Sequence, residues 1–241
     1  SLCDNEQLWA VGAATPGGWD WANPTQIPCN GAGEYSGQIT LTNNEAFRFF
    51  TIRDDWGSGQ NVRFGIKVVA DNQSIEGFRF SNVYVHDVFP TPTALEHQHK
   101  GYGIKIETQS DLTIDSAHLA YDIHFSGLSV SRTGHYGIWI KSLGLSQNDL
   151  LKNQTITMES CVFDNTGGAG FVPNKSEFVL VENCTFNHSG SSVDPRMWKR
   201  GSGMWPFDCR NVVAQHNHFL NAHGPIDSYG AHIDYGNENV A

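Results

Sequence analysis

The stretch Gly137-Ile138-Trp139-Ile140-Lys141 is a five-residue phrase that returns along the chain and decides its fold. Its second and fourth positions are apolar, whereas its third and fifth positions are polar or aromatic. This alternation is that of a strand with one buried face. Related phrases begin at Gly103, Gly170, Gly203 and Gly230. Such a recurring phrase is typical of a stack of equivalent coils.

A second, apolar phrase precedes each glycine phrase and ends at Val85, Val130, Phe163, Phe186 or Phe219. Phe163 and Phe186 are 23 residues apart, and the interval on either side of this pair is 33 residues. A coil of 23 residues with insertions of about ten fits a parallel β-helix, in which loops lengthen without disturbing the stack. We therefore predict an all-β protein with a small β unit over residues 1–65 and a parallel β-helix over 66–241. Since the chain stops at Ala241, where a new coil begins, we expect the helix to be incomplete there.

Composition narrows the classes of function. The formal net charge of −10 argues against non-specific binding to nucleic acid. The sequence contains no run of eighteen apolar residues, so we predict no transmembrane span. The five cysteines form no CxxC motif, and no compact acidic run is present, so we predict neither a metal nor a cofactor. Cys3 and Cys29 are a candidate disulfide. Cys161 and Cys184 occupy equivalent positions one coil apart and predict an inward cysteine ladder, with a disulfide as the alternative.

The N-terminal unit contains four of the seven tryptophans, and Trp9, Trp19 and Trp21 lie close together in Leu8-Trp9-Ala10-Val11-Gly12-Ala13-Ala14-Thr15-Pro16-Gly17-Gly18-Trp19-Asp20-Trp21. That stretch resembles the opening of small β-sandwich domains in Bacteroidetes starch-utilisation outer-membrane binding lipoproteins. The resemblance implies glycan binding through aromatic side chains. The alternative is that these tryptophans are core packing, or that the unit caps the β-helix.

Long insertions predict a groove. The apolar and glycine phrases are separated by seven residues in two neighbouring coils, but by eighteen and seventeen residues in the coils on either side. One insertion, Phe89 to Tyr102, contains Glu96, His97, His99 and Lys100, and the other is Ser191 to Arg200. Both leave the same corner, about 14 Å apart at strand spacing. We expect them to form two walls above a low floor, the geometry of a ligand site.

The alternation also sorts side chains into inward and outward columns. We expect the second and fourth positions of every phrase to face inward, including Ala231 and Ile233 in the last coil. Trp139 and Trp205 then face outward, two coils or about 10 Å apart, which suits stacking on sugar rings. Ordinary packing beneath a flanking loop is the alternative.

Titratable residues are densest near the C-terminus, and glycoside hydrolysis needs two carboxyl groups. We predict a site drawn from Asp208, Asp227, Asp234, His223 and His232. The histidines are candidates for an acid, a base or a hydroxyl-binding group. For any one of these residues, a turn-capping or solvated role is the alternative.

A polysaccharide lyase would use the same groove differently, with a base and cations that stabilise an enolate. Lys141, His135, Lys199 and Arg200 are the candidate cations and, with Trp139 and Trp205, the candidate substrate-binding residues. The expected partner is a polysaccharide or oligosaccharide, neutral or anionic.

The segments Gly203-Met204-Trp205-Pro206-Phe207-Asp208 and Asp227-Ser228-Tyr229-Gly230-Ala231-His232-Ile233-Asp234 are similar to segments of secreted bacterial right-handed β-helix proteins of polysaccharide-utilisation systems. The resemblance covers about residues 75–241 and implies a right-handed helix at a secreted, periplasmic or outer-membrane-surface location. That architecture hosts hydrolases, lyases and non-catalytic binders. A glycoside hydrolase is therefore our first hypothesis; a lyase, a glycan-binding or adhesin-like protein, and a scaffold fragment are the alternatives.

Overall fold

The computed structural model describes residues 7–11, 16–18, 20, 22–28, 48–50, 64–70, 74–89, 101–109, 118–143 and 152–241. The chain divides into two compact units, Ser1–Gln60 and Asn61–Ala241. In the first unit, β1 (Gln7–Val11) pairs antiparallel with β2 (Thr25–Pro28) and with β3 (Arg48–Phe50). Trp9 is buried in this unit, so its ring is core packing. Trp19, Trp21, Trp56, Cys3 and Cys29 lie outside the described residues, and the sandwich and glycan-binding assignments stay predictions.

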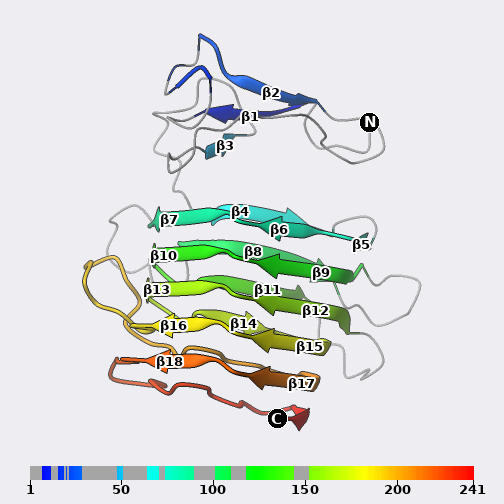
Figure 1. Cartoon of the computed structure of the whole chain (residues 1–241), viewed down its shortest axis with the longest axis vertical. Helices are drawn as coiled ribbons and strands as arrows, with labels where there is room; N and C mark the ends of the chain where they lie inside the picture. Colours follow the sequence, from blue (N-terminus) through cyan, green and yellow to red (C-terminus); the bar gives the residue numbers. More distant parts are fainter. Residues whose placement is uncertain are drawn as a thin grey trace. The chain divides into compact units, whose positions relative to one another are not determined.

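The second unit is a parallel β-helix whose coils each contribute to three sheets (Figure 1). The glycine-phrase sheet contains β4 (Phe64–Val69), β8 (Tyr102–Gln109), β11 (Ile138–Leu143) and β14 (Phe171–Pro173). The apolar-phrase sheet contains β7 (Tyr84–Val88), β10 (Ser129–Thr133), β13 (Val162–Thr166), β16 (Thr185–Asn187) and β18 (His218–Leu220). The third sheet contains β5 (Ile75–Glu76), β6 (Arg79–Ser81), β9 (Ala120–Ser126), β12 (Asn153–Glu159), β15 (Ser176–Glu182), β17 (Arg210–Gln215) and β19 (Glu238–Val240).

The register confirms the predicted stacking of both phrases. Val130 pairs with Val85 and Phe163, and Phe186 pairs with Phe163 and Phe219. In the glycine phrase, Ile138 pairs with Ile104 and Phe171, and bridges continue the column through Met204 to Ala231. One more copy of the phrase, Gly65-Ile66-Lys67-Val68-Val69, precedes the predicted ones and pairs in register with β8.

Sharp corners explain why asparagine and glycine punctuate the chain. At the corner between the third sheet and the apolar-phrase sheet, one residue per coil adopts a left-handed backbone: Asn82, Gly127, Ser160, Asn183 and His216. Asparagine and glycine tolerate positive φ better than most residues, so they recur at this position. The corner therefore turns with a single residue in every coil, which keeps the coils superimposable.

The predicted core columns are largely confirmed. Phe163 and Phe186 stack with ring centroids 4.8 Å apart, and Phe186 stacks on Phe219 at 5.1 Å. Cys161 and Cys184 are fully buried free thiols, so the inward cysteine ladder is confirmed and contains no disulfide. Ala231 continues the column in register with Met204, but neither it nor Ile233 is buried, and Ile233 is 58% exposed. No later glycine phrase of the described chain packs against their coil.

The phrase glycines from Gly65 to Gly203 each leave room for an apolar side chain of the following strand of the apolar-phrase sheet. A Cβ atom at Gly137 would lie 2.7 Å from Phe163 Cδ1 and 2.6 Å from the carbonyl oxygen of Gly170. The same clash would arise between Gly170 and Phe186, at 2.5 Å. Real Cβ atoms are excluded at such distances, so the glycine is required by the ring that packs over it.

We expect Gly137→Ala to lower the free energy of unfolding by about 1–3 kcal/mol, because the new methyl group overpacks the contact with Phe163. In a Phe163→Ala background the same substitution should cost less, since the ring is gone and only the carbonyl contact remains. The measurement is a double-mutant cycle by urea denaturation. Strict additivity of the two substitutions would contradict this account of the glycine.

Candidate functional site

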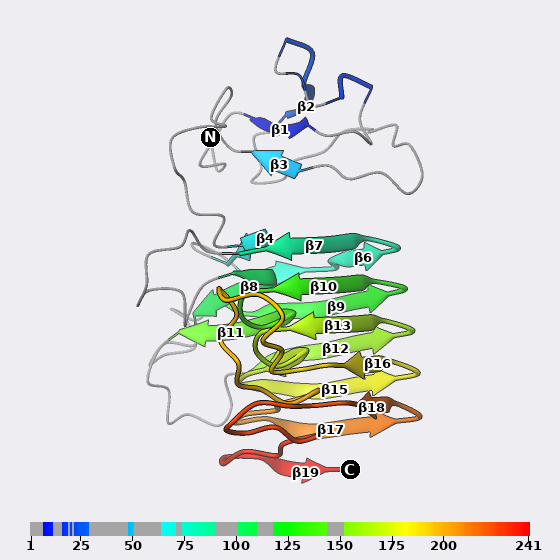
Figure 2. The same ribbon diagram turned by 90° about the vertical axis from the view of Figure 1, so that its left-hand side faces the viewer.

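The loop Ser191–Arg200, here named the strap, lies across the stack (Figure 2). The Trp198 amide donates to the Gly134 carbonyl at 2.8 Å, and the Arg200 amide donates to the Gly167 carbonyl at 3.1 Å. Met197, within the strap, is fully buried. The predicted wall is therefore a cover over the two short turns, and the expectation that those turns form an open floor is wrong. The other predicted wall lies mostly at residues 90–100, outside the described residues.

The strap reaches the level of the first coil of the helix. The Arg196 guanidinium lies 4.0 Å from the centroid of the Phe89 ring, just after β7. Asp194 accepts two hydrogen bonds from the Arg196 guanidinium, at 2.8 and 2.7 Å, which hold the guanidinium in that orientation and lower the pKa of the Asp194 carboxyl although burial opposes the shift. Both ends of the strap are thus anchored, and it forms a fixed border to the outward column of the glycine phrase.

Aromatic side chains fill the space beneath the strap. Trp198 stacks on His135 with centroids 4.2 Å apart and an interplanar angle of 14°. Tyr102 and Tyr136 contact the same imidazole, which is only 2% exposed. His135 is therefore not the accessible cation that the sequence suggests, because the ring of Trp198 closes over it.

The two predicted sugar platforms differ in exposure. Trp205 is only 9% exposed and packs with Ala169 and Val172, while His232 stacks on its ring at 4.8 Å and 18°. The expectation of an open Trp205 platform is wrong, because the next coil supplies this imidazole. Trp139 is partly exposed, with Lys105 and Lys141 ammonium groups 5.1 and 5.0 Å from its ring centroid.

Asp227 and Asp234 flank the stacked pair of Trp205 and His232. Asp227 Oδ2 accepts from the Arg200 guanidinium at 2.5 Å, and Asp227 Oδ1 lies 4.0 Å from His232 Nδ1. Asp234 Oδ2 accepts from the Trp205 indole N–H at 2.8 Å, and its Oδ1 accepts from the Tyr235 amide. The structure therefore brings together five predicted site residues, with a defined orientation for each carboxylate: Arg200, Trp205, Asp227, His232 and Asp234.

Two tyrosines of this region were not among the predicted site residues. Burial raises the pKa of Tyr102 and Tyr136 well above the ordinary tyrosine range. For Tyr136, Arg200 opposes that rise, whereas Asp227 and Asp234 add to it, so its hydroxyl lies within the electrostatic reach of the whole site. The only sequence signal was its position immediately before Gly137, at the short turn between the two phrases.

A charged group above Trp139 was also missed. Lys105 is buried and paired with Glu107, which also lies 3.4 Å from Lys67. Burial lowers the pKa of Lys105 despite this pairing, while the two ammonium groups lower the pKa of Glu107 against the effect of its burial. The Lys105 ammonium lies over the rings of Tyr102 and Trp139.

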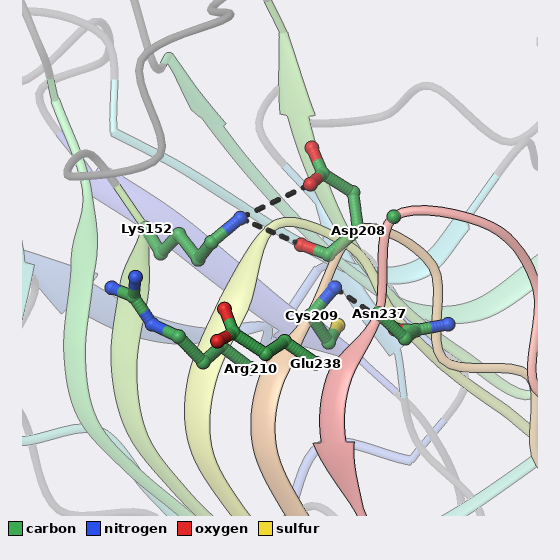
Figure 3. A pocket seen from close by; sticks show the side chains of 7 residues that line it. Lys152, Asp208, Cys209, Arg210, Asn237 and Glu238 are labelled. Carbon is green, nitrogen blue, oxygen red and sulfur yellow. Dashed lines mark hydrogen bonds and ion pairs between the residues drawn. The ribbon is translucent and has the colours of Figure 1, made fainter.

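Asp208 lies at a different corner of the coil. Lys152 Nζ donates to its carboxylate at 3.1 Å and to its carbonyl at 3.0 Å. They line a cavity of about 300 Å³ together with Cys209, Arg210, Gly236, Asn237 and Glu238 (Figure 3). Arg210 is engaged by Glu177, and Asn237 bonds to Pro206 and Cys209, so most polar groups of this cavity hold the coil together. The prediction of Asp208 as a partner of Asp227 or Asp234 is therefore not supported by its contacts.

The remaining predicted residues lie at the edge of the site. His223 Nδ1 donates to the Asn221 carbonyl at 2.8 Å, and its ring packs edge-on against His188 rather than on the carboxylate pair. Lys199 is exposed on the strap with a left-handed backbone.

In the parts of the chain that the structure describes, no three His, Cys, Asp or Glu side chains converge as metal ligands. The same parts contain no helix long and apolar enough to cross a membrane.

Comparison with known structures supports the fold. Two crystal structures of a GH136 lacto-N-biosidase from Eubacterium ramulus, native and selenomethionine forms, match with TM-scores of 0.50 and 0.49 at 19% and 18% identity. Each match covers 72% of this chain but only 32% of the enzyme. At such identity the likeness shows the fold alone. No curated protein matches the sequence significantly.

The family comparison gives the assignment. The model of the right-handed β-helix region matches residues 64–241, which begin with β4 and include every coil described above. This match covers most of the chain and agrees with its parallel three-sheet topology. The chain belongs to the right-handed β-helix family.

Proposed function

We propose that this β-helix is a glycoside hydrolase whose paired carboxylates are Asp227 and Asp234. The observation that supports this most directly is the placement of the two carboxylates around the Trp205–His232 stack. Each is oriented by a donor of its own, Arg200 for Asp227 and the indole N–H for Asp234. Glycoside hydrolysis needs two carboxyl groups in different environments, and these two have different partners.

In the proposed reaction, one carboxyl group donates its proton to the glycosidic oxygen as the C–O bond breaks. The bonding electron pair leaves with that oxygen. The other carboxylate either attacks the anomeric carbon or takes a proton from the attacking water. His232, which stacks on Trp205 and lies 4.0 Å from Asp227 Oδ1, is suited to bind a sugar hydroxyl. Fixed partners for both carboxylates reduce the reorganisation that the reaction requires.

Trp139 is the proposed neighbouring subsite. It lies two coils from Trp205 and three coils from His232 in the same outward column, a separation from His232 of about 14 Å along which more than one sugar residue fits. Its partly exposed ring is suited to the apolar face of a sugar, and Lys141 beside it is suited to hydroxyl or carboxylate oxygens.

A polysaccharide lyase fits the contacts less well. That reaction needs cations free to stabilise an enolate. Arg200 is paired with Asp227, Lys105 is paired with Glu107, and His135 is buried under Trp198. Arg200 and Lys105 are thus compensated by acids of the chain itself and His135 is covered, which favours hydrolysis over a reaction that relies on these cations.

We further propose that the protein acts outside the bacterial cytoplasm, as a secreted, periplasmic or outer-membrane-surface protein, since its substrate class is found there. The N-terminal unit is a candidate for additional glycan binding within a polysaccharide-utilisation system. Glycans with lacto-N-biose units belong in the substrate panel, because the structurally similar enzyme is a lacto-N-biosidase.

Asp227→Asn and Asp234→Asn should each lower kcat by about 10²- to 10⁴-fold, because each removes a proton donor or acceptor while conserving shape. Asp208→Asn is the matched control: it replaces a carboxylate bound to Lys152 and should leave kcat within a few-fold. Initial rates on the best glycan of the panel and circular dichroism of each variant provide the test. Equal losses for all three variants would argue against the assigned pair.

The product should distinguish the reaction classes. Hydrolysis releases a new reducing end with no increase in ultraviolet absorbance, whereas a lyase creates an unsaturated uronate that absorbs. We expect the first result, measured by reducing-sugar assay and spectrophotometry on the same digest. Binding on a glycan array with no product from any bound glycan would instead support a non-catalytic glycan-binding protein.

A further inference from the structure

The outward face of the glycine-phrase sheet is basic over its first three strands. The strands β4, β8 and β11 contain three lysines, Lys67, Lys105 and Lys141, and a single acid, Glu107. This surplus of cations contrasts with the formal net charge of −10 of the whole chain. A local positive surface on an acidic protein suits a ligand that carries negative charge.

Two of the three lysines already occupy Glu107. Its Oε2 atom accepts from the Lys105 ammonium, and its Oε1 atom lies 3.4 Å from Lys67 Nζ. Lys141 is in register with Glu107 on the neighbouring strand, but both carboxylate oxygens are taken. Among the residues that the structure describes, no acid lies within ion-pair distance of Lys141, so a ligand can compensate its charge.

The Lys141 ammonium lies over an aromatic ring instead. Its Nζ atom is 5.0 Å from the centroid of the Trp139 ring, and both side chains are partly exposed. A cation–π contact at such a site is weaker than a charge-assisted hydrogen bond to a carboxylate. A bound carboxylate would therefore draw this ammonium off the ring and leave the ring to the ligand. Lys105, in contrast, is only 6% exposed and is held by Glu107.

One strand presents the ring and the ammonium side by side. Trp139 and Lys141 are alternate residues of β11, so their side chains leave the same face of the sheet. A uronate residue carries its carboxylate on the edge of a sugar ring whose C–H face is apolar. Such a ring suits the Trp139 indole while its carboxylate accepts from Lys141.

The position of this pair along the stack gives it a role in binding. Trp139 lies three coils, or about 14 Å, from His232 in the outward column. An acidic sugar on Trp139 is therefore separated by more than one sugar residue from the bond that is cleaved beside His232. A lyase would need the acidic sugar at the reacting centre, whereas this arrangement uses its charge only to hold the glycan.

We propose that Trp139 and Lys141 form a subsite for an acidic sugar residue, a uronate or another carboxylate-bearing sugar, of the glycan that is cleaved. This inference rests on the proposed hydrolase function and names the class of its substrate. Because the distant carboxylate is bound equally in the ground state and in the transition state, loss of the contact raises KM and leaves kcat unchanged.

The test compares acidic glycans with the same glycans after chemical reduction of their carboxyl groups, on an array and by isothermal titration. We expect reduction to weaken binding about tenfold, the effect of one charge-assisted hydrogen bond, and added salt to weaken binding of the acidic form alone. Lys141→Met should abolish the difference between the two forms. Lys141→Arg should retain it, because the positive charge is kept.

Arg79→Gln is the matched control. Arg79 is exposed on the third sheet and paired with Asp122, so its replacement changes the net charge equally and should leave the preference for acidic glycans unchanged. If acidic and carboxyl-reduced glycans bind alike, or if Lys141→Met keeps the preference, the acidic subsite is refuted, and cleavage of the carboxyl-reduced glycans would leave the hydrolase standing. Preferential binding of acidic glycans that are never cleaved would refute the hydrolase but support the subsite. A protein that neither binds nor cleaves any glycan would refute both.

Discussion

The fold depends on one contact that repeats from Gly65 to Gly203, between a glycine without a side chain and an apolar side chain of the following strand of the apolar-phrase sheet. Phe163 packs against Gly137, Phe186 against Gly170 and Phe219 against Gly203. The contact joins two of the three sheets and fixes the rotation of each coil relative to its neighbour. Hydrogen bonds between parallel strands alone would allow one strand to shift along its neighbour. A ring that fits only over glycine specifies the register of the two strands.

This register also determines where chemistry is placed. Because the glycine phrase is held in line, its third position forms one outward column that includes Trp139, Trp205 and His232. The column is sheltered on one side by the strap, which hydrogen-bonds to the short turns at Gly134 and Gly167. Side chains of the column that pack against the strap have few alternative rotamers. The site is therefore built on rigid strands with a bordering loop, an arrangement that favours preorganised contacts.

The sequence predicted the in-register features well, because identical spacing in the chain becomes direct contact in a stack. The sequence prediction failed for side chains whose exposure depends on a loop or on a residue of another coil. Periodicity placed Trp205 and His135 outward or accessible, but the path of the strap and the stacked imidazole of His232 bury them. No local sequence pattern encodes the path of the strap.

The copy of the glycine phrase at Gly65 was missed because its spacing of 38 residues to Gly103 departs from the intervals near 33.

The acidic residues show why density of titratable groups was only a partial guide to the site. Asp208 and Asp227 each bind a cation, but the side chain of Lys152 is only 6% exposed, whereas that of Arg200 is 39% exposed and lies beside Trp205. A buried ammonium is stabilised only while its acid stays paired with it, so Asp208 has little freedom to exchange partners. A half-exposed pair can exchange its cation for a substrate hydroxyl at moderate cost. The distinction between a structural and a reactive aspartate therefore depends on the burial of its partner, which the order of residues along the chain does not specify.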